Sequence, residues 1–182
     1  MSDNGRKEQY VFKILLLGDG GVGKTSLLRR YIDNTFEPDY KSTIGVQFMT
    51  KVVETEDTTT KLVIWDVAGQ SKFTSYRHLY YKDAEGIILI YDMTRPKTFE
   101  NLPIWIEDAL KHTAKNTKIA LLGNKADLVD KKVVSREHGE KFSKTNPNIV
   151  LFEETSAKTG KNVNNAYMAL VRVILGSSRT RK

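Results

Sequence analysis

The sequence contains no cysteine. Disulfide frameworks, zinc–thiolate sites and thiol catalysis are therefore excluded, and this composition fits a reducing compartment. No apolar run approaches the ~20 residues that a helix needs to span a bilayer, and the polar residues 1–10 contain no signal-peptide core. With 182 residues, of which 40% are hydrophobic and 28% are charged, the chain is long enough for one domain that buries a sizeable core.

Acidic residues are absent from the last part of the chain, where none follows Glu154. The charged residues beyond that point are all basic: Lys158, Lys161, Arg172, Arg179, Arg181 and Lys182. The formal net charge of +7 therefore arises mainly near the C-terminus. This pattern predicts a solvated helix end, and a basic tail over residues 177–182 that leads toward an anionic membrane is the alternative. No basic stripe interleaved with aromatic residues accompanies it, so no nucleic-acid partner is expected.

Short apolar or β-branched runs alternate with helical patterns along the sequence. The runs predict six strands, at residues 11–17, 47–54, 60–66, 86–91, 118–123 and 149–152. The helical patterns lie at about 24–32, 72–82, 98–111 and 135–144, and in a last segment whose apolar stripe runs from Val163 to Ile174. Residues 1–9 are predicted to form a disordered arm. The rest is predicted to be an α/β domain whose mostly parallel sheet binds ligands at the carboxyl ends of its strands.

A glycine-rich turn follows the first predicted strand. Residues 18–25, Gly-Asp-Gly-Gly-Val-Gly-Lys-Thr, match G-x-x-x-x-G-K-[ST] between that strand and a helix. The glycines let backbone N–H groups wrap closely around phosphates, and the helix N-terminus adds positive potential. Lys24 can reach β- and γ-phosphates, and the Thr25 hydroxyl can ligate Mg²⁺. A chance glycine-rich turn is the alternative, which the strand–turn–helix context disfavours.

Two further motifs distinguish between the nucleotide bases. Asn124-Lys125-Ala126-Asp127 follows an apolar strand, and its Asp127 carboxylate can accept hydrogen bonds from guanine N1–H and N2–H₂. Adenine has no donor at these positions and would leave that carboxylate unpaired. Residues 155–158, Thr-Ser-Ala-Lys, follow another strand and would direct the Ala157 N–H at guanine O6. In this order with the phosphate loop, the motifs predict GTP or GDP rather than ATP.

The remaining chemistry is predicted in residues 39–45 and 65–70. Asp66 can hold Mg²⁺ through a water, the Gly69 N–H can approach a γ-phosphate, and Gln70 can orient the attacking water. Thr43 is the candidate that closes over Mg²⁺ and the γ-phosphate. Catalysis is therefore assigned to Lys24, Thr43, Gly69 and Gln70, and the Mg²⁺ site to Thr25, Thr43 and Asp66.

Together these motifs resemble the Ras superfamily of small GTPases over residues 10–176. Within the superfamily the sequence is most similar to the Rab family. The segments that carry this similarity are 44–48, 61–66, Tyr76-Arg77 with Tyr80-Tyr81, and 86–92. The resemblance implies a P-loop NTPase fold, the Ras-like G domain. Its six-stranded, mostly parallel sheet has one antiparallel strand and five flanking helices, and two of its loops order around GTP.

The resemblance also implies site residues and partners. Phe36 matches the aromatic that packs edge-on against guanine. The full implied nucleotide set is Gly20, Gly21, Val22, Gly23, Lys24, Thr25, Ser26, Phe36, Tyr40, Thr43, Gly69, Asn124, Lys125, Asp127, Ser156, Ala157 and Lys158. Phe48, Trp65 and Tyr80 match an aromatic triad that faces effectors, with core packing as the alternative for each. A monomer is expected, with an exchange factor, effectors, and an activating protein that supplies an arginine.

The sequence departs from the Rab pattern at several positions. Val67 stands where the family usually has threonine, Ser71 where it has glutamate, and Gln47 where it has a common aspartate. Rab proteins end in a prenylated cysteine pair, whereas this sequence ends at Arg181-Lys182. Either the native chain continues to such a tail, which is the favoured alternative, or the protein is unlipidated. A lipidated tail would place it on the cytosolic face of an endomembrane, in vesicle traffic.

Three functions remain open from the sequence. The first is a switch that hydrolyses GTP and thereby changes its affinity for partners. The second is a module that binds guanine nucleotide without hydrolysing it, and the third is a Ras-like GTPase without a role in membrane traffic. Gln70 favours hydrolysis.

Overall fold

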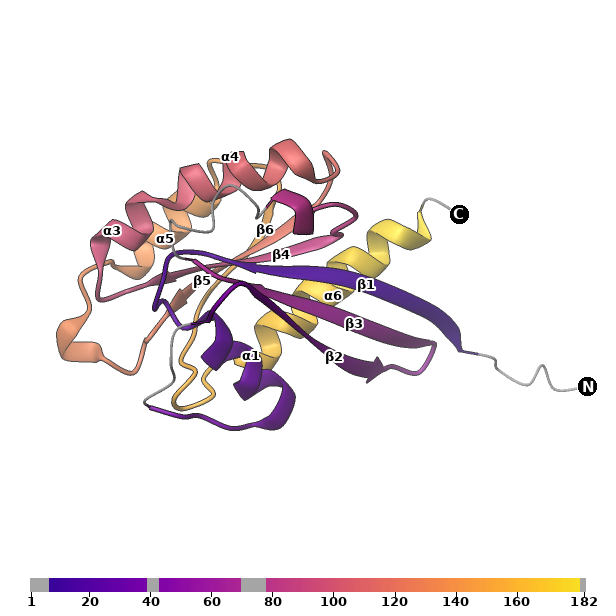
Figure 1. Cartoon of the computed structure of the whole chain (residues 1–182), viewed down its shortest axis with the longest axis horizontal. Helices are drawn as coiled ribbons and strands as arrows, with labels where there is room; N and C mark the ends of the chain where they lie inside the picture. The colour runs from indigo at the N-terminus through magenta and orange to yellow at the C-terminus, as the bar shows by residue number, and fades with distance from the viewer. Residues whose placement is uncertain (1–6, 39–42, 70–77, 181–182) are drawn as a thin grey trace, which may run out of the picture.

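The computed structural model describes residues 7–38, 43–69 and 78–180. The strands among these residues form one six-stranded sheet with the order β2-β3-β1-β4-β5-β6. Neighbouring strands are parallel, except that β2 and β3 form an antiparallel hairpin. Helices α1 and α6 cover one face of the sheet, and α3, α4 and α5 lie over the other (Figure 1). The predicted fold class is confirmed.

The strands are β1 (Glu8–Leu17), β2 (Val46–Glu54), β3 (Thr58–Val67), β4 (Gly86–Asp92), β5 (Lys118–Asn124) and β6 (Ile149–Glu154). The α-helices are α1 (Lys24–Asp33), α3 (Pro96–Glu100), α4 (Leu102–His112), α5 (Arg136–Ser143) and α6 (Val163–Arg179). Two short 3₁₀ turns complete the described elements, η2 (His78–Tyr80) and η3 (Val129–Lys131).

The centre of the sheet is buried on both faces, which explains its continuous apolar runs. Every residue of β4 is buried, and so are all residues of β5 after Lys118. The strand register places Leu16 opposite Asp66, Asp92 opposite Asn124, and Gly123 opposite Glu154. Asp66, next to last in β3, and the polar residues that end β4, β5 and β6 therefore lie along one edge of the sheet, at the carboxyl ends of these strands. The predicted motifs begin at this edge.

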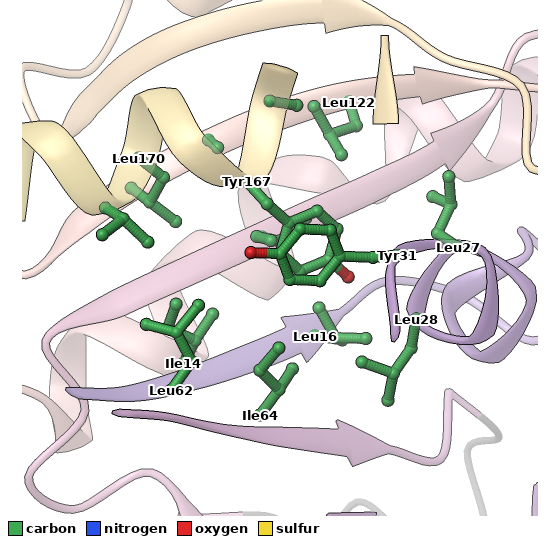
Figure 2. Close-up of a cluster of buried hydrophobic side chains, with 14 of the residues drawn as sticks. Ile14, Leu16, Leu27, Leu28, Tyr31, Leu62, Ile64, Leu122, Tyr167 and Leu170 are labelled. Carbon is green, nitrogen blue, oxygen red and sulfur yellow. The ribbon is translucent and has the colours of Figure 1, made fainter. Parts of the chain in front are cut away.

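The core beneath α1 and α6 is aliphatic around one aromatic pair. Tyr31 of α1 and Tyr167 of α6 stack with ring centroids 3.9 Å apart and an interplanar angle of 8° (Figure 2). Leucines and isoleucines of β1, β3 and β5 surround the pair, among them Leu16, Ile64 and Leu122. The stripe from Val163 to Ile174 faces this core, so it serves packing, as expected. This packing holds α1, the helix that directly follows the phosphate loop, against the sheet and α6.

The opposite core connects α4 to the phosphate loop. Trp105 of α4 packs among buried residues of β1 and β4. Its Nε1 donates a hydrogen bond to Asp19 Oδ1 at 2.7 Å, and Asn101 Nδ2 donates to Asp19 Oδ2 at 2.7 Å. One carboxylate of the phosphate loop is therefore held by two side chains from the start of α4.

The predicted helix over 98–111 is wrong in its continuity, because the structure divides this segment into α3 and α4 at Asn101. Pro103 has no N–H to donate to the carbonyl four residues before it, so a single helix would lose a hydrogen bond here. The predicted helix over 72–82 is also wrong in its described part, where residues 78–80 form η2 and 81–83 a turn. Residues 70–77 lie outside the described ranges.

Both ends of the domain differ from the predicted boundaries. Strand β1 begins at Glu8, because Glu8 and Gln9 pair with Thr58 and Thr59 of β3 although they are not apolar. These two residues therefore belong to the sheet and not to an arm. Helix α6 continues to Arg179, so residues 177–179 are helical. Within the described part of the chain, no helix has the length and apolar character to cross a membrane.

Candidate nucleotide-binding site

The loop between β1 and α1 has a backbone shape that requires glycine at defined positions. Gly18 and Gly23 adopt φ values of 136° and 100°, in the region that side chains disfavour. A Cβ on Gly18 would collide with the carbonyl of Ile90, and one on Gly23 with the side-chain amide of Asn124. The loop therefore packs directly against the ends of β4 and β5.

Lys24 extends back over this loop. Its Nζ donates to the carbonyl oxygens of Gly18 at 2.7 Å and Asp19 at 2.9 Å, and the residue is buried. A Cβ on Gly69 would lie 2.5 Å from Lys24 Nζ and would also collide with the Gly18 carbonyl. The chain after β3 therefore closes on the loop, and it brings the Gly69 backbone beside the lysine ammonium.

Three oxygen-bearing side chains meet next to Lys24. Thr25 Oγ1 donates to Asp66 Oδ2 and lies 2.7 Å from Thr43 Oγ1, which is 3.4 Å from the same carboxylate oxygen. Asp66 is fully buried, and burial raises the pKa of its carboxyl group, opposed by the Thr25 bond, the Lys24 charge and the Thr43 bond. Within the described ranges, Asp66 Oδ1 has no hydrogen-bond partner.

This cluster fits a magnesium ion. Mg²⁺ prefers hard oxygen ligands such as carboxylates and hydroxyls. A buried carboxylate oxygen that lacks a partner is costly unless a ligand or cation compensates it. Thr25, Thr43 and Asp66 supply hydroxyl and carboxylate oxygens. Asp66 Oδ1 is the buried oxygen that a bound cation would compensate.

Asn124 joins two loops to the end of β5. Its Nδ2 donates to the Val22 carbonyl at 2.9 Å, and its Oδ1 accepts from the Ala157 N–H at 3.3 Å and Thr155 Oγ1 at 3.4 Å. The side chain is buried, so water does not replace these bonds. The phosphate loop and the loop after β6 are therefore fastened to one another through this amide.

Asp127 is oriented by a buried serine. Ser156 Oγ donates to Asp127 Oδ1 at 2.6 Å, and Ser156 itself is fully buried. Arg30 of α1 secures the same loop from the other side, because it donates to the Ala157 and Lys158 carbonyls at 2.8 and 2.7 Å. The sequence analysis did not assign Arg30. No local motif marks it, and its partners lie far along the chain.

Asp92 is a second residue that the sequence analysis did not assign a role. It ends β4, is fully buried and forms an ion pair with Lys125 Nζ at 2.7 Å. Burial opposes its ionisation, but hydrogen bonds from Lys125, Thr94 and Arg95 together hold the pKa of Asp92 below its usual value. A polar residue that ends an apolar strand is the only sequence signal for it.

These elements surround one cavity of about 470 Å³. The predicted residues that line it are Gly20, Gly21, Gly23, Lys24, Thr25, Ser26, Phe36, Thr43, Gly69, Asn124, Lys125, Asp127, Ala157 and Lys158. Val22 packs in the core, and Ser156 lies behind Asp127. Glu37, Pro38 and Leu128 also line the cavity, although no motif marked them. Tyr40, Gln70 and Ser71 lie outside the described residues.

Residues 13–176 match the family model described as Ras family. That match spans nearly the whole chain. The chain belongs to the Ras family. Ras-family proteins are small GTPases, so the four motifs around this cavity are those of a guanine-nucleotide-binding domain.

The Ras-family domain also places three aromatic rings side by side outside the cavity. Phe48 and Trp65 have ring centroids 5.5 Å apart, and Trp65 and Tyr80 are 5.9 Å apart. Phe48 is 62% exposed, whereas Trp65 and Tyr80 are half-buried. Of the departures from the Rab pattern, Val67 is buried in the core beneath α4 and Gln47 is exposed on β2.

Proposed function

We propose that this Ras-family protein is a molecular switch that binds GDP and GTP with Mg²⁺ and hydrolyses GTP. One observation carries the proposal: Asp127 lines the same cavity as Lys24 and Thr25. A carboxylate suits the donors of guanine, and an ammonium in a glycine-rich loop suits phosphates.

The base is recognised by Asp127 in this proposal. Ser156 orients the carboxylate, which accepts hydrogen bonds from guanine N1–H and N2–H₂. Phe36 and Lys125 line the cavity. The Phe36 ring and the aliphatic stem of Lys125 are surfaces against which a bound base can pack. The Ala157 N–H, expected to bond guanine O6, is 3.3 Å from Asn124 Oδ1 here. This bond is long, so the N–H can turn to a stronger acceptor.

The phosphates are bound by the loop and by Lys24. The ammonium now bonds to two loop carbonyls, and these bonds preset its position for β- and γ-phosphate oxygens. Thr25, Thr43 and Asp66 would hold Mg²⁺, which when bound neutralises charge that develops on the phosphate oxygens. The Gly69 N–H and Thr43 are the groups that detect a γ-phosphate.

Hydrolysis by the protein alone is expected to be slow. The sequence has no arginine between Arg30 and Arg77, so the loop before Thr43 supplies no arginine to the transition state. An intrinsic rate of order 10⁻⁴–10⁻³ s⁻¹ follows, and an activating protein that inserts an arginine is expected to add ~10³–10⁵-fold. Gln70→Leu is expected to slow even the intrinsic rate, because the attacking water loses its orienting amide.

Single-turnover release of phosphate from preloaded GTP measures this rate. A partner-free rate near 1 s⁻¹ would contradict the expectation. If the wild type binds GTP but releases no phosphate, the result would instead support a module that binds guanine nucleotide without hydrolysing it.

The γ-phosphate is expected to order two segments, about 36–48 and 66–82. Thr43 and Gly69 both border the cavity and can bond to an oxygen that GDP lacks. Hydrogen exchange in the GDP form and in a form with non-hydrolysable GTP tests this, with slower exchange expected in both segments of the GTP form. Helix α6, whose residues belong to neither segment, serves as the internal reference. Equal exchange of both segments in the two forms would refute the switch.

The Rab-type role is the finer part of the proposal. The exposed Phe48 beside Trp65 and Tyr80 supports a surface that effectors read together with the two switch segments. An exchange factor and an activating protein complete the cycle, and a lipidated native tail would hold the protein on an endomembrane. Endomembrane localisation of a tagged protein with its native C-terminus is expected, and diffuse distribution would favour a Ras-like GTPase without a traffic role.

A further inference from the structure

Arg95 lies on the outer side of the phosphate loop, although it comes from the turn between β4 and α3. Its Nη2 donates to the Gly20 carbonyl at 3.0 Å, and its Nε donates to Asp92 Oδ2 at 2.8 Å. A Cβ built on Gly21 would lie 3.6 Å from the same Nη2. The guanidinium therefore bridges Gly20 and Gly21 of the loop to the end of β4.

The anchor of this bridge is rigid. Asp92 is fully buried, and its Oδ1 accepts from the Thr94 N–H at 2.9 Å and the Thr94 hydroxyl at 2.7 Å. Its Oδ2 accepts from Arg95 and also pairs with Lys125 Nζ at 2.7 Å. A carboxylate held by so many donors cannot rotate freely, so it fixes the direction of a guanidinium that is itself 44% exposed.

This bridge acts on the most deformable part of the site. Glycine-rich segments have the largest conformational freedom of any backbone, so a loop built from them loses its binding shape readily. A planar guanidinium can bond two oxygens in a fixed geometry, which a lysine ammonium on a flexible stem does not reproduce. Holding the loop in its binding shape lowers the free-energy cost of keeping a ligand there.

We propose that Arg95 is a positioning residue that clamps the phosphate loop to Asp92 and so slows the release of bound guanine nucleotide. The clamp also connects two parts of the cavity lining, because Asp92 pairs with Lys125 of the proposed base site while Arg95 bonds Gly20 of the phosphate loop. This inference rests on the proposed function, since it concerns the retention of the nucleotide assigned to the cavity. The arginine acts through the loop and is separate from the one expected from an activating protein.

The experiment measures the release of a fluorescent GDP from the full chain, chased with excess unlabelled GDP in the presence of Mg²⁺. Arg95→Ala is expected to release the nucleotide about tenfold faster than the wild type, as for the loss of one charge-assisted hydrogen bond. Lys97→Ala is the matched control. It also removes one positive charge, two residues along the chain, and the Lys97 side chain pairs with exposed Glu100. Its release rate is expected to equal that of the wild type.

Arg95→Lys separates geometry from charge. It keeps the positive charge but lacks the two-pronged guanidinium, so it is also expected to release GDP several-fold faster than the wild type. Because the clamp acts on a loop closed around the ligand, the association rate of Arg95→Ala is expected to change less than its dissociation rate.

Two results would overturn the clamp: equal release from Arg95→Ala and Lys97→Ala, or wild-type release from Arg95→Lys. Failure of the proposed function looks different, because the wild type itself would then retain no fluorescent GDP.

Discussion

Asp127→Asn is expected to weaken GDP binding by about 10³-fold or more, as for a site whose buried hydrogen-bonding group meets the wrong partner. The wild-type carboxylate offers only acceptors, and Ser156 holds it in place through a 2.6 Å hydrogen bond. The variant amide would direct an N–H donor at a guanine donor. Xanthine has a carbonyl where guanine has its amino group, so the variant is expected to bind xanthosine diphosphate better than GDP.

Equilibrium titration with fluorescent GDP and fluorescent xanthosine diphosphate measures this change in preference. Asp130→Asn is the matched control, since it is the same substitution at an exposed position three residues along the chain. The control is expected to retain wild-type affinity for GDP. If Asp127→Asn and Asp130→Asn bind GDP equally, Asp127 does not recognise the base.

Asn124→Ala is expected to cost about 1–3 kcal/mol of folding free energy, because it leaves buried groups without partners. The Val22 carbonyl loses its 2.9 Å donor, and the Ala157 N–H and Thr155 hydroxyl lose their acceptor. With these two loops released from each other and from the end of β5, we expect GDP to dissociate about 10²-fold faster, the size of effect that small misplacements in a site produce.

Asn148→Ala distinguishes stability from function. Asn148 also bonds two backbone carbonyls, those of Lys115 at 2.9 Å and Thr117 at 2.8 Å, but at the amino end of β5 and β6. Both variants are expected to unfold at lower denaturant concentration than the wild type, and only Asn124→Ala to release GDP faster. Equal release from the two variants would show that Asn124 contributes to the site through general stability alone.

The phosphate loop could be predicted from the sequence because its physical requirements are local. A buried strand, glycines at strained positions and a helix that begins at Lys24 follow one another within a few residues. The same holds for Asn124 and Asp127, which directly follow β5. Each motif carries its own geometry, and the parallel sheet brings the motifs to one edge.

The supporting residues could not be predicted, because their partners are distant along the chain. Arg30 bonds the Ala157 carbonyl across 127 positions, and Arg95 bonds the Gly20 carbonyl across 75. Apolar periodicity also predicted one helix where Pro103 imposes two. Strand β1 begins earlier than predicted because the backbone of Glu8 and Gln9 pairs with β3, although neither residue has an apolar side chain.

The central claim is that this cavity is specific for guanine nucleotides, and competition against bound fluorescent GDP in Mg²⁺ tests it most directly. GDP and GTP are expected to displace the probe at about equal concentrations, because both present the same base to Asp127. ATP is expected not to displace it even at ~10³-fold excess, since adenine leaves that carboxylate unpaired. Displacement by ATP at the concentration at which GTP acts would contradict the account.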